Sequence, residues 1–139
     1  MRRVLFDSDV LLDVLTQRQL FVVASAQALN MATQPQVQGY VAGHAVTNIF
    51  YILRRQVGSV SARELLSRLL QHLQIADVTD EVIRSALDSA MTDFEDAVTS
   101  EAANAADIEI IVTRNTPDFA VSVIPAVLPA EFLAMVRGS

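Results

Sequence analysis

A short apolar run near the amino terminus leads straight into an acidic residue, and this feature restricts the possible folds more than any other. Val4, Leu5 and Phe6 are followed directly by Asp7. A brief, continuous apolar run of this kind is typical of a strand buried on both faces in a parallel sheet. Ligands of open α/β sheets bind at the carboxyl ends of such strands. We therefore expect Asp7 to lie at the functional edge of a sheet, where other acidic residues converge on it.

Similar strands alternate with helical patterns along the rest of the chain. The expected strands are 4–7, 37–42, 74–78 and 108–113, with 121–124 as a candidate final edge strand. The expected helices are 10–18, 21–31, 44–55, 61–73, 79–87, 93–106 and a terminal helix that begins at Pro129. This alternation implies parallel pairing with helices on both faces of the sheet. We expect one domain over residues 1–139, a three-layer α/β/α sandwich around a mainly parallel sheet of four to five strands.

Composition limits the chemistry of the chain. The net charge of −6 argues against strong non-specific binding to nucleic acid, which needs clustered cations. Because the sequence has no cysteine, disulfides, thiolate metal sites and cysteine nucleophiles are excluded, and a reducing compartment fits. The apolar run at the amino terminus is too short for a secretory signal or a membrane span. We expect a cytoplasmic protein without a membrane partner.

Acidic and amide residues recur where later strands end and later helices begin. Asp96 falls in the first turn of a predicted helix, and Asn115 and Asp118 follow the strand at 108–113. Since these places share one edge of a parallel sheet, we expect the side chains to meet Asp7 there. Carboxylates that meet repel one another unless a cation bridges them, and oxygen ligands suit Mg²⁺ or Mn²⁺. Water bound to such a metal can attack a phosphodiester.

Several of the titratable residues also have purely structural interpretations. Asp93 is best interpreted as a helix cap, and Asp9 and Asp13 as a cap and a solvent-facing residue of the first helix. We expect His44 and His72 to be structural or exposed. The acid that ends the first strand is harder to explain in this way, because a carboxylate beside apolar sequence is costly to bury without a partner.

Four segments, in the order FDSDVLLD, AVTNIFYILRR, DFEDAVTSEAA and IIVTRNTPDF, resemble the PIN-domain family, in particular its toxin-like, VapC-type branch. The resemblance extends from Val4 to about Phe132. It implies a three-layer fold and a ribonuclease, dependent on Mg²⁺ or Mn²⁺, that is the toxin of a toxin-antitoxin pair. It also implies an RNA substrate, an antitoxin partner and a homodimer, for which the apolar first helical hairpin is a candidate contact surface.

The same resemblance assigns roles to individual residues. It makes Asp7 the first metal-binding acid and Asp96 the third, while Asn48 and Asn115 stand where the family usually has the second and fourth acids. Each amide removes a negative charge, and Asp118 is the first candidate to compensate. We expect catalysis by the three aspartates and metal binding by these aspartates with Asn115. Asp93 and Glu95 are further candidates to compensate for the missing acids. Supporting or substrate-binding roles are expected for Ser8, Asn48, Asp93, Thr113, Arg54, Arg55 and Arg114.

Other functions fit parts of the pattern. A haloacid-dehalogenase-like phosphatase and a response-regulator receiver both use acidic residues around a nucleophilic aspartate, but both also need a lysine. This chain contains no lysine. The alternative that stays open is a non-catalytic PIN-fold interaction module whose acidic site is degenerate, because two of the four acid positions hold amides.

Overall fold

A five-stranded, all-parallel sheet forms the centre of the computed structural model, which describes residues 1–138. The strands are β1 (Arg2–Phe6), β2 (Val37–Ala42), β3 (Gln74–Ala76), β4 (Ile110–Val112) and β5 (Ala126–Val127), in the order β3-β2-β1-β4-β5. β1 is the middle strand, and its Phe6 is in register with Val112 of β4. This register brings the residues that follow the two strands, Asp7 and Thr113, side by side at the carboxyl edge.

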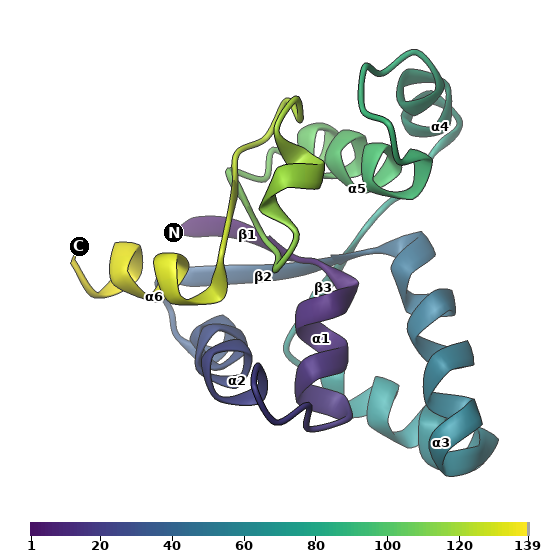
Figure 1. Ribbon diagram of the computed structural model, residues 1–139, viewed down its shortest axis with the longest axis vertical. Coiled ribbons are helices and arrows are strands. Elements are labelled where there is room, and N and C mark those ends of the chain that lie inside the picture. Colours follow the sequence, from purple (N-terminus) through teal and green to yellow (C-terminus); the bar gives the residue numbers. More distant parts are fainter. Residues whose placement is uncertain (139) are drawn as a thin grey trace.

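Helices cover both faces of the sheet (Figure 1). α1 (Ser8–Leu15), α2 (Val22–Asn30), α3 (Gly43–Leu69) and α6 (Pro129–Arg137) lie on one face, and α4 (Asp80–Leu87) and α5 (Phe94–Ala105) lie on the other. Two short 3₁₀ helices, η1 (Met31–Thr33) and η2 (Thr116–Phe119), complete the chain, and η2 contacts α5. The predicted three-layer α/β/α architecture is confirmed. No helix within residues 1–138 combines the length and the apolarity that a bilayer crossing demands.

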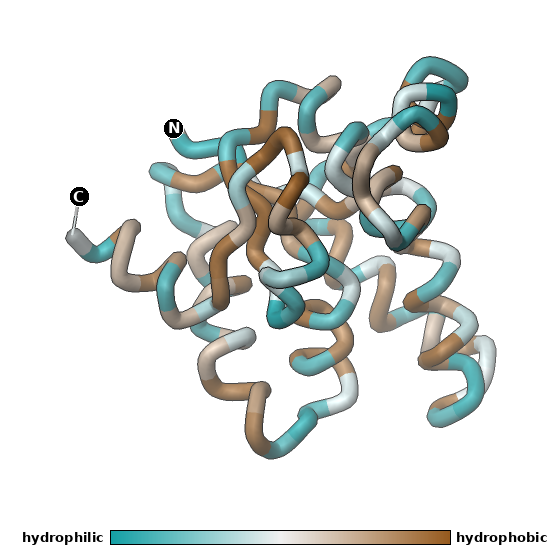
Figure 2. The backbone as a smooth tube through the Cα atoms, turned by 45° about the horizontal axis from the view of Figure 1, so that its top comes forward, coloured by the Kyte–Doolittle hydropathy of each residue, from teal (hydrophilic) through white to brown (hydrophobic). Residues whose placement is uncertain are grey.

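The core lies on both sides of β1. Val4, Leu5 and Phe6 are fully buried, as a central parallel strand requires. The Phe6 ring contacts the ring of Phe132 on α6 edge to face, with centroids 6.1 Å apart. Figure 2 accordingly shows hydrophobic residues along the segments that run through the middle of the molecule. Asp7 therefore follows one of the most deeply buried segments of the chain.

Two predicted elements differ from the structure. The final edge strand expected at 121–124 is wrong, because this segment is a turn and β5 starts at Ala126. The Ser122 hydroxyl bonds both the N–H and the carbonyl of Ile124, a local pattern that competes with strand pairing. The helix expected from 61 already begins after Gly58, whose φ of 83° interrupts α3 in a region that favours glycine.

Candidate active site

Asp7 is an almost fully buried carboxylate without a cationic partner in the part of the chain that is described. It caps α1 and is 8% exposed. Its oxygens accept hydrogen bonds from the Ser8 N–H and from the Thr113 hydroxyl, both at 2.9 Å. Burial raises the pKa of Asp7 to about 6, and the negative charge of Asp9 adds to this effect. The fold therefore keeps an acid at the sheet edge where a positive charge would be stabilised.

Asp96 reaches the same edge from the other helical layer. The Asp93 side chain caps α5 and accepts a hydrogen bond from the Asp96 N–H at 2.9 Å, which confirms the predicted cap. Partial burial raises the pKa of Asp96 to about 7, and repulsion by Asp7, Asp93, Asp118 and Glu95 adds to the shift. Asp7 and Asp118 are remote from Asp96 in sequence. Because their charges raise the pKa of Asp96, both acids lie near Asp96 in the folded chain.

Thr113 holds Asp7 from the interior of the protein. Its hydroxyl accepts a hydrogen bond from the Asn115 N–H at 3.1 Å and donates one to Asp7 Oδ2. The Thr113 side chain is fully buried, so it orients the acid rather than facing a phosphate. Asp9 supports the same loop, because its Oδ2 accepts the Arg114 N–H at 3.0 Å. The loop after β4 is thus bonded to the start of α1 at several points.

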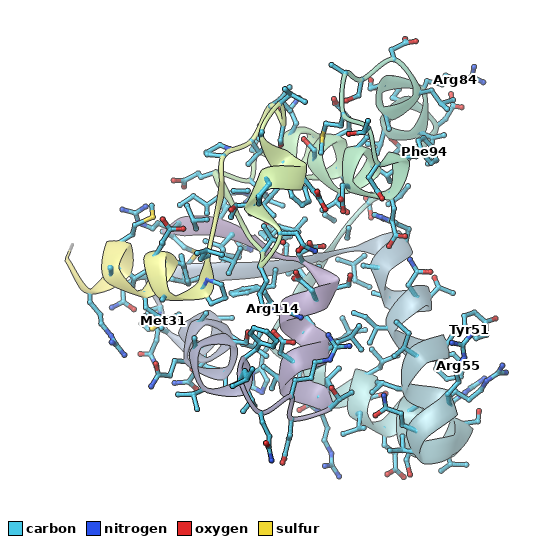
Figure 3. The ribbon with its side chains drawn as sticks, viewed as in Figure 1. Met31, Tyr51, Arg55, Arg84, Phe94 and Arg114 are labelled. Carbon is cyan, nitrogen blue, oxygen red and sulfur yellow. The ribbon has the colours of Figure 1, made fainter. Side chains whose placement is uncertain are left out.

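Asp13 is buried in an ion pair, so the prediction that it faces solvent is wrong. Its carboxylate accepts hydrogen bonds from Arg114 Nε at 2.7 Å, from Arg114 Nη2 at 3.1 Å and from the Ser25 hydroxyl at 3.0 Å. Arg18 Nη1 lies 3.5 Å away. The Arg114 guanidinium also lies 3.9 Å from the centre of the Phe21 ring, beside α1 and α2 (Figure 3). In this geometry the Arg114 guanidinium is bonded to Asp13, and the predicted contact of Arg114 with substrate stays a prediction.

Asn48 connects α3 to the first turn of α5. Its Nδ2 donates a hydrogen bond to Glu95 Oε1 at 2.8 Å. The His44 ring strengthens this connection, since Nε2 lies 3.2 Å from the Glu95 carbonyl oxygen and 3.3 Å from the Thr99 hydroxyl. Burial lowers the pKa of His44 and favours the neutral ring. The amide thus holds the Glu95 carboxylate close to the position where an acid is missing.

Four further predicted residues are exposed, namely Asn115, Asp118, Arg54 and Arg55. Asn115 precedes η2, and its carbonyl accepts the Asp118 N–H at 3.0 Å. Arg54 and Arg55 lie on α3, up to about 10 Å from Asn48 along the helix axis at a rise of ~1.5 Å per residue. The charges of Asp7 and Asp118 both act on Asp96, whereas the two arginines lie farther along α3 than Asn48.

The donor set fits a hard divalent cation that keeps many of its waters. It consists of oxygen atoms from Asp7, Asp96 and Asp118, with Glu95 and Asn115 nearby. Among residues 1–138, no three His, Asp or Glu side chains are arranged so that together they could hold a metal ion. Mg²⁺ binds to proteins through one or two carboxylates and fills its shell with water, so an open arrangement suits it. The raised pKa values of Asp7 and Asp96 mark these two acids as lacking a countercharge.

Comparisons with known proteins agree with this architecture. The chain resembles a toxin-antitoxin complex from Klebsiella pneumoniae (22% identity, TM-score 0.70, 91% of this chain and 97% of that chain). It also resembles VapBC2 from Rickettsia felis bound to a promoter DNA fragment (10%, 0.70, 91% and 98%). The sarcin-ricin loop cleaving toxin VapC20 of Mycobacterium tuberculosis is similar too (13%, 0.63, 78% and 86%). No curated protein matches. A family model described as the PIN domain matches residues 3–117, and the chain therefore belongs to the PIN-domain family.

Proposed function

We propose that the protein is a metal-dependent endoribonuclease that hydrolyses RNA phosphodiester bonds as the toxin of a toxin-antitoxin pair. The observation that carries this proposal is the convergence of Asp7 and Asp96, both with raised pKa values, at the carboxyl edge of a parallel sheet. Neither acid has a cationic side chain beside it among residues 1–138. A divalent metal would neutralise the repulsion between them.

Asp7 and Asp96 would hold Mg²⁺ or Mn²⁺, with Asp118 and Asn115 binding it directly or through water. When bound, the metal supplies an activated water and offsets negative charge on the scissile phosphate. Thr113 and the Ser8 N–H fix the orientation of the Asp7 carboxylate by hydrogen bonds. Glu95 remains at the open side of the site, where it can orient a water or accept its proton.

Cleavage of labelled single-stranded RNA in Mn²⁺ by Asp7→Asn and Asp96→Asn tests this proposal. We expect both variants to lose at least about 100-fold in rate, because loss of a ligand exceeds the 10- to 100-fold typical of an outer-sphere change. Asp80→Asn is the matched control, since this exposed acid on α4 forms an ion pair with Arg84. Equal rates in all four proteins would mean that a contaminating nuclease cuts the RNA, and the enzymatic proposal would be abandoned.

The two amides favour one alternative, a PIN fold that acts only through a partner. Asn48 and Asn115 leave the site with fewer charges than four acids would provide, and no closed cage is present within residues 1–138. An interaction module of this kind would bind its partner equally well with and without EDTA. It would also tolerate Asp7→Asn without loss of function.

An antitoxin protein and a second copy of the chain are the partners that we propose, in a cytoplasmic setting. The antitoxin is supported by the similar structure from Klebsiella pneumoniae, which is described as a toxin-antitoxin complex. The hairpin of α1 and α2 exposes apolar side chains: Leu20 is 90% exposed and Val23 is 65% exposed. Exposed apolar groups of this size indicate a contact surface. A Leu20→Glu, Val23→Glu variant that sediments as the wild type does would exclude this surface from the dimer.

A further inference from the structure

The first half of α3 has an exposed face that begins at the acidic site. Asn48, Tyr51 and Arg55 are spaced three and four residues apart and therefore share one face of the helix. All three are exposed, and Figure 3 shows Tyr51 and Arg55 on the same side of α3. Asn48 is bonded to Glu95 at the inner end of this face. The face thus leads from the acids outward over about 10 Å at a rise of ~1.5 Å per residue.

The exposed face of α3 lies on a helix rich in arginine, although the protein as a whole carries a negative charge. α3 carries Arg54, Arg55, Arg63 and Arg68 but only one acid, Glu64. The ion pairs found in residues 1–138 involve other arginines, namely Arg18, Arg84 and Arg114. The arginines of α3 are therefore available to an outside anion, although the net charge of the chain is −6. Such side chains suit the phosphate backbone of a nucleic acid.

Tyr51 provides an aromatic surface in the same place. Its ring meets the Phe50 ring edge to face at 5.4 Å, and the Arg54 guanidinium lies 5.1 Å from its centre. These contacts restrain the ring, yet Tyr51 is 49% exposed. The other tyrosine, Tyr40, is 4% exposed in the core. Restrained, exposed aromatic rings flanked by arginine are the platforms on which single-stranded nucleic acids stack their bases.

We propose that single-stranded RNA leaves the metal site along this face, with one base stacked on Tyr51 and a neighbouring phosphate bound by Arg55. Arg54 flanks the ring and strengthens the stack. The inference rests on the proposed nuclease function, because the acids define where the strand starts. RNA is favoured over an acidic protein segment because the face is continuous with the acids through Asn48 and includes an aromatic platform.

Cleavage kinetics on a random pool of single-stranded RNA test the role of the ring and the charge. Tyr51→Ala should raise KM about tenfold, because base stacking on aromatic side chains carries that much affinity, while Tyr51→Phe should stay within about twofold. Arg55→Ala should also raise KM and should lower the slope of log KM against log salt by about 0.7, the value for one phosphate contact in single strands. Arg68→Ala, an equal loss of charge beyond Gly58, is the matched control.

Direct contact is measured by ¹⁹F NMR on protein labelled with 3-fluorotyrosine, in the Asp96→Asn background so that the RNA stays intact. The two tyrosines give two resonances, which Tyr51→Phe assigns. The same RNA pool should shift the Tyr51 signal and leave the Tyr40 signal in place.

The outcomes separate this inference from the nuclease proposal. If wild type cuts RNA but Tyr51→Ala and Arg55→Ala behave like Arg68→Ala, only the inference is overturned. If RNA shifts the Tyr51 signal and is not cut by wild type, the inference stands and the nuclease proposal falls. If the wild type neither cuts nor binds RNA, both are overturned. If these variants lose an acidic protein partner and keep their KM for RNA, the face is a protein-docking surface and the inference is wrong.

Discussion

Asp7 and Asp13 lie at the two ends of α1, and they differ in the charge of the groups that surround them. Asp13 is fully buried and is bonded to Arg114, with Arg18 and the Ser25 hydroxyl beside it. Asp7 is almost as deeply buried, but its partners are a hydroxyl and a backbone N–H, and further acids lie around it. The difference shows that burial alone does not identify a functional acid. The informative feature is a buried acid that lacks a countercharge.

Removing the charge of Asp13 should have the largest effect on the free energy of unfolding. Asp13→Ala leaves the Arg114 guanidinium without its partner, and breaking a buried ion pair in this way costs about 3–5 kcal/mol. We expect that loss in the free energy of unfolding, measured by urea denaturation without metal at pH 8. Asp7→Asn should be neutral or slightly stabilising under the same conditions, because it removes repulsion from neighbouring acids. Equal losses in both variants would show that Asp7 is structural in the same sense as Asp13.

The stabilisation of the folded protein by Mn²⁺ should depend on Asp7 and Asp96. Mn²⁺ that binds only the folded protein stabilises it by about 2.7 kcal/mol when its concentration is 100 times the Kd. We expect this increase for wild type in thermal or urea denaturation, and no increase for Asp7→Asn or Asp96→Asn. Asp80→Asn should respond as wild type does. A full response in Asp7→Asn would move the metal site elsewhere.

A smaller effect is expected from pH. The pKa of Asp7 in the folded protein is about 6 and lies above its ordinary value of 3.8, so the folded state binds the proton more tightly than the unfolded chain. The stability that this proton contributes is complete below pH 3.8 and is lost as pH rises through 6. Between pH 5 and 8 the loss for Asp7 alone is about 1 kcal/mol. Urea denaturation at both pH values should show it as a difference between wild type and Asp7→Asn, in which the opposite contribution of His44 cancels. Parallel pH profiles for the two proteins would contradict the pKa shift of Asp7.

The sequence predicts those features that depend on local pattern. The apolar run 4–6 identifies the central strand, and the predicted cap Asp93 begins the helix expected at 93–106. The placement of Asp7 and Asp96 at one edge follows from parallel topology, which the alternation of strands and helices already implies.

Features that depend on packing between distant segments are not predictable in this way. The pairing of Asp13 with Arg114 joins residues 101 positions apart, and only the folded sheet brings them together. The bond between Asn48 and Glu95 likewise requires that α3 and α5 meet across the edge of the sheet. Glu95 carried one weak sequence signal, its position beside Asp96, and Tyr51 carried none that distinguished it from a core aromatic residue.

A crystal soaked in MnCl₂ would show whether Asp7 and Asp96 together bind a divalent cation. We expect an anomalous peak whose distances to a carboxylate oxygen of each residue match direct metal–oxygen bonds, with Asp118 or Asn115 at the same ion or its waters. A well-ordered crystal with no peak between the two acids, or with manganese bound only at Asp80 or another surface acid, would contradict this expectation.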